Sequence, residues 1–173
     1  MAVTIDMKSI GLQDALDLAV LIEEEARVRY LELADQMIKH DTKEPARFFQ
    51  FMAGNELKHR DQLMEQRERL FAGVPVAVTL EDLYDVEAPD YDEVRAFMTP
   101  REALQVALRA EEKAEAFFTA ALREVRDTAV KELFTELRDE ETEHRRLVFQ
   151  QLTKTPVEGP ITLADTADED HAE

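Results

Sequence analysis

The 173-residue sequence contains no cysteine and has only 4 glycines and 6 prolines. The absence of cysteine excludes disulfides, Cys-x-x-Cys redox pairs, iron–sulfur clusters and thiolate-bound zinc. Any bound metal must therefore be held by oxygen and nitrogen atoms. Because turn-forming residues are scarce and 45 % of the residues are apolar, the composition favours long helices over many short strands.

The sequence also has few basic residues and no long apolar run. The chain has 21 Lys+Arg against 39 Asp+Glu, a net charge of -18. Such a surface repels phosphate backbones and attracts cations, which argues against a nucleic-acid partner. No apolar run approaches the roughly 18 residues of a membrane span, and residues 1–20 do not resemble a signal peptide. We therefore expect no membrane association and a cytoplasmic location.

Four segments carry apolar residues at alternating spacings of three and four, the pattern of amphipathic helices. The expected helices cover residues 12–40, 42–71, 99–125 and 128–152. Only about two residues separate the first helix from the second and the third from the fourth, so each pair should form an antiparallel hairpin. Residues 72–98 are long enough to run the length of a bundle. The sequence predicts an all-α four-helix bundle of two hairpins joined by one long crossover.

Local motifs mark several of the expected helix ends. Asp41 or Thr42 is expected to cap the second helix, with Glu44 completing an Asp-x-x-Glu box, and Gly73 is expected to end it. The third helix opens on residues 99–102, Thr-Pro-Arg-Glu, a capping box with proline at the first helical position. These motifs place the helix starts close to the ends of the apolar stripes.

The last residues differ in composition from the rest. Residues 155–173 contain two prolines and six acidic residues, and they have no apolar periodicity after Leu163. A segment of this composition cannot bury enough apolar surface to fold. We predict one domain, residues 1–154, with the linker 72–98 inside it, followed by a disordered acidic tail.

Each apolar stripe is interrupted near its middle by acidic residues or histidine. The first and third segments each supply one glutamate, and the second and fourth each supply a Glu-x-x-His pair. The six residues are Glu23, Glu56, His59, Glu111, Glu141 and His144. All follow the spacing of their own stripe, so they should point into the bundle, where an unpaired carboxylate is costly. Glu112 remains an alternative to Glu111.

The two halves repeat this pattern at similar spacing, since Glu23 and Glu56 are 33 residues apart and Glu111 and Glu141 are 30 apart. Residues three apart share one helix face, so the Glu and His of each pair can bind the same ion. Four carboxylates balance the charge of two divalent cations. Carboxylates and imidazoles without thiolates suit iron or manganese, although zinc also binds such sets. The pattern predicts a two-metal centre whose open positions admit oxygen or peroxide.

Three stretches, residues 23–30, 55–59 and 139–144, resemble the metal-binding helices of the rubrerythrin-like branch of the ferritin-like superfamily. That superfamily binds two irons with one Glu from each of two helices and a Glu-x-x-His from each of the other two. The resemblance, which covers residues 12–152, implies a ferritin-like bundle with two iron ions. It also implies reduction of hydrogen peroxide or oxygen, or oxidation of ferrous iron, in a homodimer or larger homo-oligomer. Tyr30 would donate a hydrogen bond to a ligand carboxylate, unless it is only a core side chain.

The chain also departs from this family in ways that leave alternatives open. Without cysteine it lacks a rubredoxin domain, so electrons must come from another protein or from ferrous iron. Phe118 stands where the second half of the family often has a tyrosine, and Glu115 is the nearest candidate for the family's extra helix-three glutamate. The first hypothesis is a di-iron peroxidase with an external electron donor. The alternatives are an iron-handling ferroxidase and a structural metal-binding bundle without turnover.

Overall fold

The computed structural model describes residues 5–79 and 98–157, and it contains four long helices. These are α1 (Leu12–Lys39), α2 (Lys43–Phe71), α4 (Pro100–Glu124) and α5 (Thr128–Lys154), and the described residues include no strand. The four predicted helices are confirmed, with ends that agree to within about two residues, the usual uncertainty of a helix boundary. The predicted path of the crossover and the predicted disorder of the acidic tail lie largely outside the described residues.

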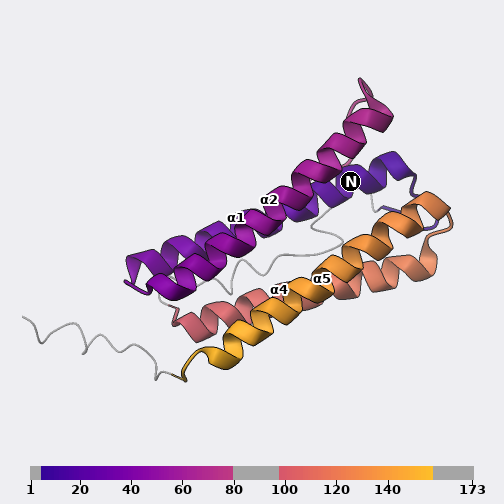
Figure 1. The fold of residues 1–173 in the computed structure, drawn as a ribbon. Helices are drawn as coiled ribbons and strands as arrows, with labels where there is room; N and C mark the ends of the chain where they lie inside the picture. Colours follow the sequence, from indigo (N-terminus) through magenta and orange to yellow (C-terminus); the bar gives the residue numbers. More distant parts are fainter. Residues whose placement is uncertain (1–4, 80–97, 158–173) are drawn as a thin grey trace, which may run out of the picture.

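The helices form two hairpins, α1 with α2 and α4 with α5, and the hairpins lie against each other (Figure 1). This arrangement confirms the predicted four-helix bundle. None of the helices in the described ranges is long and apolar enough to cross a membrane.

The apolar core consists of two clusters at different levels along the bundle. One is built around Leu16, Phe118 and Phe134, and the rings of Phe118 and Phe134 lie edge to face with centroids 5.4 Å apart. The other is built around Phe49 and Met52. These five side chains are fully buried. Side chains that lie between the two clusters are therefore enclosed by apolar groups and shielded from bulk water.

Capping explains where the second hairpin's helices begin. The Thr99 hydroxyl accepts a hydrogen bond from the backbone N–H of Glu102 at 3.2 Å, and the Glu102 carboxylate accepts one from the backbone N–H of Thr99 at 2.9 Å. This is the predicted capping box of α4. At the start of α5, the Asp127 carboxylate accepts from the backbone N–H of Val130 at 3.0 Å, which satisfies one donor of the first turn.

The start of α2 differs from the prediction. Asp41 takes a left-handed conformation (φ 56°) in the short connection from α1, and no side chain caps α2. The Thr42 hydroxyl instead donates to the carbonyl oxygen of Met37 at 2.9 Å. The predicted Asp41-x-x-Glu44 box is therefore wrong, because both residues before the helix are used to close α1. The predicted end is confirmed, since Gly73 follows α2 with φ 74°.

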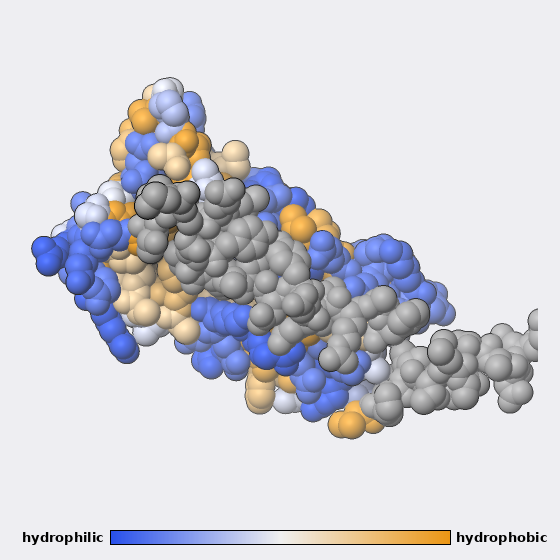
Figure 2. Space-filling view, turned by 180° about the vertical axis from the view of Figure 1, so that it is seen from behind, coloured by the Kyte–Doolittle hydropathy of each residue, from blue (hydrophilic) through white to orange (hydrophobic). Residues whose placement is uncertain are grey.

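The outer surface is strongly polar. Viewed from behind, hydrophilic residues cover much of the described surface, and hydrophobic residues form separate patches between them (Figure 2). This agrees with a chain in which 35 % of the residues are charged. Among the described residues, five large apolar side chains are nevertheless more than half exposed: Ile38, Phe51, Val76, Phe149 and Val157.

Candidate metal centre

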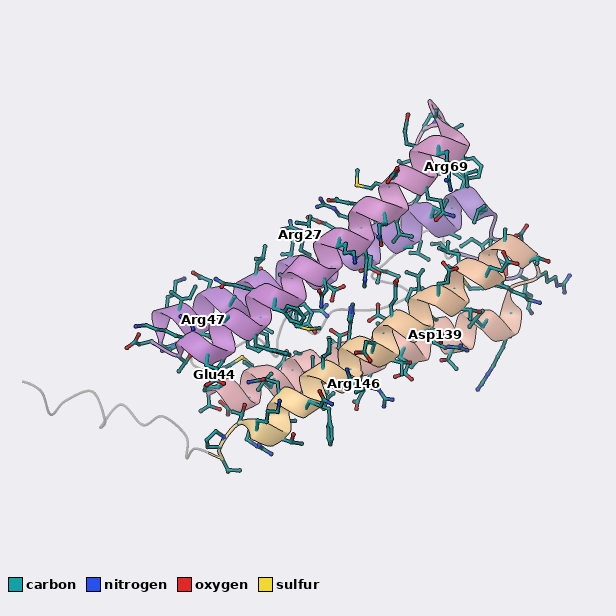
Figure 3. All side chains as sticks on the ribbon, viewed as in Figure 1. Arg27, Glu44, Arg47, Arg69, Asp139 and Arg146 are labelled. Carbon is teal, nitrogen blue, oxygen red and sulfur yellow. The ribbon has the colours of Figure 1, made fainter. Side chains whose placement is uncertain are left out.

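All four helices send polar side chains into the space between the two apolar clusters, and Figure 3 shows the side chains along the facing sides of the hairpins. Here lie the six residues that the sequence analysis singled out: Glu23 from α1, Glu56 and His59 from α2, Glu111 from α4, and Glu141 and His144 from α5. Five of them are between 1 % and 4 % exposed, and the side chain of His59 is 17 % exposed. The structure therefore brings all six into one largely buried layer.

Helix geometry accounts for their shared direction. A spacing of three residues places Glu56 and His59 on one face of α2, and Glu141 and His144 on one face of α5. A shift of one residue turns a side chain by about 100° around the helix. Glu111 is accordingly buried while its neighbour Glu112 is exposed. The structure thus places Glu111, and not Glu112, at the centre.

The imidazole of His144 lies among three carboxylates. Its Nδ1 atom is 3.2 Å from Oε1 of Glu56, and it is 3.8 Å from Oε2 of both Glu111 and Glu141. These carboxylates come from α2, α4 and α5. Oxygen and nitrogen atoms that converge this closely can bind one cation, and Glu111, Glu141 and His144 form such a group.

The imidazole of His59 forms the second half of the centre. Its ring stacks on that of His144, with centroids 5.2 Å apart and an angle of 10° between the planes. Its Nδ1 atom lies 3.9 Å from Oε2 of Glu23 and 3.7 Å from Oε2 of Glu140. These three residues form another group that could hold a cation, and Glu56 groups with both histidines. The centre therefore has two halves that share Glu56.

Glu140 is the residue at this centre that the sequence analysis did not select. It follows Asp139 and precedes Glu141, one residue away from the apolar stripe of α5. The sequence feature that could have predicted Glu140 at this centre is its position four residues before His144, which places it on the flank of the same helix face. Its carboxylate reaches His59 from the neighbouring helix.

Several buried atoms of the centre lack hydrogen-bond partners within the described part of the chain. They are both carboxylate oxygens of Glu23 and Glu56, and the Nδ1 atoms of His59 and His144. Burying such groups without partners costs on the order of 2–7 kcal/mol each, and native proteins rarely leave them unsatisfied. Cations bound between them would satisfy these atoms. The residues therefore fit a pair of metal ions, and the oxygen and imidazole donors suit iron, manganese or zinc.

The electrostatics of the layer favour neutral side chains in the absence of a cation. Burial raises the pKa of Glu23 to about 8. Burial and, next, the charge of nearby carboxylates raise the pKa of Glu56 and of Glu111 well above the usual 4.5. Burial and the neighbouring His144 lower the pKa of His59 to about 4. Cations that bind here would replace protons on the carboxylates.

Tyr30 makes a direct contact with the centre. It is 2 % exposed, its ring lies beside Phe49 with centroids 6.1 Å apart, and its hydroxyl donates a hydrogen bond to Oε1 of Glu111. Burial, followed by the charge of Glu111, raises the pKa of Tyr30 well above 10, so the phenol stays protonated. This bond fixes one oxygen of Glu111 and leaves Oε2 facing His144.

Two residues named on the basis of the family resemblance lie elsewhere. The carboxylate of Glu115, the candidate for an extra ligand, accepts from Nε of Arg145 at 2.8 Å, and it belongs to none of the three groups that could hold a cation in the described ranges. Phe118 lies fully buried in the apolar cluster with Phe134. The second hairpin therefore has no counterpart to the Tyr30 phenol at this position.

Comparison with known proteins places this geometry in context. The family model described as Rubrerythrin matches residues 14–92 and 102–166. The chain is also similar to an uncharacterised conserved protein from Magnetospirillum magnetotacticum whose crystal structure is known. The two share 29 % sequence identity with a TM-score of 0.72, over 88 % of this chain and 100 % of that one. A comparison with curated proteins found no match.

Proposed function

The chain belongs to the rubrerythrin family, and we propose that it is a di-iron oxidoreductase that reduces hydrogen peroxide with electrons from an external donor protein. The observation that carries this proposal is the layer of four carboxylates and two imidazoles between the apolar clusters. Within the described residues, the oxygens of Glu23 and Glu56 and both Nδ1 atoms are buried there without a hydrogen-bond partner. The family's ferritin-like fold and the residue types of the layer both support a metal pair.

The halves of the centre divide the ligands between two ions. Glu23 and His59 would hold one ion, and Glu111, Glu141 and His144 would hold the other. Glu56, which groups with both histidines, would be shared. Four carboxylates then carry the charge that two divalent cations neutralise, so the buried layer as a whole is close to neutral.

The chemistry divides between the metal pair and the protein. When bound, two ferrous ions supply the two electrons that convert one hydrogen peroxide and two protons into two water molecules. The protein holds the ligands in place, and the Tyr30 phenol orients Glu111. The apolar clusters on either side restrict the access of bulk water to the layer, and a polar pocket beside His59 forms an opening to it. Because the chain has no cysteine for a rubredoxin-type centre, we assign the return of electrons to an external donor protein in this proposal.

Metal content and rapid kinetics test this function. The purified full-length chain should bind two irons, and the anaerobic ferrous form should be oxidised faster by hydrogen peroxide than by oxygen in stopped-flow absorbance. A Glu111→Ala variant should lose this reaction, whereas Glu112→Ala, which changes an exposed neighbour on the same helix, should keep it. A chain that binds metal without any redox reaction would contradict the proposal and leave a structural metal-binding bundle.

A ferroxidase that handles iron is the second candidate. The net charge of -18 draws cations toward the protein, and an acidic pocket lies beside His59. In this case ferrous iron is the substrate and supplies its own electrons. The same stopped-flow experiment separates the candidates, since faster oxidation by oxygen and iron bound beyond two per chain would favour the ferroxidase.

The Tyr30 contact yields a prediction about affinity. Tyr30→Phe keeps the ring beside Phe49 but removes the hydrogen bond to Glu111, so Oε1 of that carboxylate loses its orienting partner. Loss of such a supporting bond typically weakens metal binding by about 10–100-fold, and we expect a weakening of about tenfold. Competition for Co²⁺ against a chromophoric chelator measures it. Equal affinity of the variant and the wild type would show that the phenol only fills space.

The assembly state and location stay predictions. The resemblance implies a homodimer or larger homo-oligomer, and the exposed side chains of Ile38, Phe51 and Phe149 supply apolar surface that a second copy would cover. A cytoplasmic location is likewise what we propose from the composition.

A further inference from the structure

A pocket of about 90 Å³ opens between α2 and α5 beside His59. Figure 1 shows the two helices next to each other on the same side of the bundle. Polar groups line much of the pocket: His59, Gln62 and Gln66 from α2, and Glu136 and Glu140 from α5. A polar pocket of this size holds a few water molecules, and its carboxylates favour cations over anions. It links solvent to the His59 half of the centre.

Glu140 lines this pocket together with His59. Its Oε2 atom is 3.7 Å from Nδ1 of His59, about as close as Oε2 of Glu23 at 3.9 Å. The side chain of Glu140 is 38 % exposed, whereas that of Glu23 is 1 % exposed. One carboxylate therefore approaches His59 from the solvent side and the other from the buried side.

The atoms that Glu140 faces need a further partner. Both oxygens of Glu23 and Nδ1 of His59 are buried without a hydrogen bond among the described residues. The ligand atoms of Glu23, His59 and Glu140 all lie within 4.8 Å of one another. Without Glu140, the His59 half would have only Glu23 and His59 of its own, together with the shared Glu56. The other half has Glu111, Glu141 and His144.

We infer that Glu140 is a further metal-binding carboxylate, which completes the His59 half of the centre and is the first ligand that a divalent cation meets when it enters through the pocket. This inference rests on the proposed two-metal centre and adds a ligand from α5 to it. It makes the two halves similar in number of ligands. It also assigns the pocket a function as an entry route, because a cation that loses its water shell there is bound by Glu140 before it reaches Glu23.

Titration of Co²⁺ into the metal-free full-length protein tests the inference. The wild type should bind two Co²⁺ per chain. Glu140→Gln keeps the size of the side chain and removes its charge, so one Co²⁺ should bind about tenfold more weakly or worse while the other is unaffected. Mixing Co²⁺ with the protein in a stopped-flow instrument should also show slower filling of the weakened half. Circular dichroism checks that the variant keeps its helices.

Asp139→Asn is the matched control. Asp139, labelled on α5 in Figure 3, is the exposed neighbour of Glu140 and pairs with Arg138 at 2.7 Å. Its replacement removes the same charge one residue away and should leave both affinities unchanged. Equal weakening by both variants, or full binding of two Co²⁺ by Glu140→Gln, would overturn the inferred role of Glu140. Neither outcome would contradict the two-metal centre itself. A wild type that binds no Co²⁺ would overturn the two-metal centre and the inference with it.

Discussion

Replacing Glu56 with alanine should abolish stoichiometric metal binding at both halves of the centre. Glu56 is 1 % exposed, lies 3.2 Å from Nδ1 of His144 and groups with both histidines. If two ions share Glu56 as proposed, its removal would take one ligand from each of them. It would also remove one of the four inward carboxylate charges. We expect the chain to retain less than one metal ion after gel filtration, measured by inductively coupled plasma mass spectrometry. Glu141→Ala should have a similar effect.

Two measurements separate loss of the ligand from loss of the fold. Glu65→Ala changes an exposed glutamate on the same helix, and this variant should still bind two metal ions. Circular dichroism of Glu56→Ala should show the helical content of the metal-free wild type. If the Glu56 and Glu141 variants both retain two ions, the ligand assignment is wrong.

We expect the metal-free protein to lose thermal stability as the pH rises from about 6.5 to 8. Glu23 has a folded pKa of about 8, above its usual 4.5, so its stabilising contribution is complete below 4.5 and is lost as the pH rises through 8. His59 has a folded pKa of about 4, below its usual 6.5, so its contribution is complete above 6.5. Between pH 6.5 and 8, the buried carboxylates therefore dominate the change of stability with pH, and we expect Tm to fall by about 5 °C.

Bound metal should remove this pH dependence. Divalent cations take the place of the protons on the carboxylates. At a thousandfold excess over Kd, each site contributes about 4 kcal/mol, which corresponds to a rise in Tm of about 10 °C or more for a chain of this size. Differential scanning calorimetry at several pH values, with chelator and with Co²⁺, measures both effects.

A variant at Glu23 provides the control for this pH effect. Glu23→Gln removes one titrating carboxyl and should make the metal-free profile less steep between pH 6.5 and 8, while Glu56 and Glu111, whose pKa values are also raised, keep the rest of the slope. A Tm that chelation leaves unchanged would count against the centre as a whole.

Much of the fold could be predicted from the sequence because the information is local. Glycine and proline are scarce, and the three-four spacing of apolar residues marks each helix and its buried side. The error at Asp41 has a physical cause. The motif Asp-x-x-Glu describes a helix start in isolation, whereas Asp41 here adopts a left-handed conformation to close the preceding helix. The conformation of so short a connection is decided by the packing of both helices.

The candidate site shows the same division between local and long-range information. The stripe of each helix places Glu23, Glu56 and Glu111 inward, and each is buried. Contacts between side chains of different helices could not be predicted from the apolar stripe of a single helix. Glu140 reaches His59 from another helix, and Glu115 is bound by Arg145 of α5. Long flexible side chains at the flank of a stripe find their partners only once the hairpins are packed together.

The arrangement of the ligand layer has a consequence for how the molecule is held together. Each hairpin supplies one single glutamate and one Glu-x-x-His pair, so a bound metal pair joins parts of the chain that are far apart in the sequence. It would act as a cross-link between the hairpins, in a chain that has no cysteine for a disulfide. Unlike a disulfide, this cross-link is undone by acid or by a chelator. If each hairpin forms its helices first, metal uptake would lock the two together as the last step of assembly.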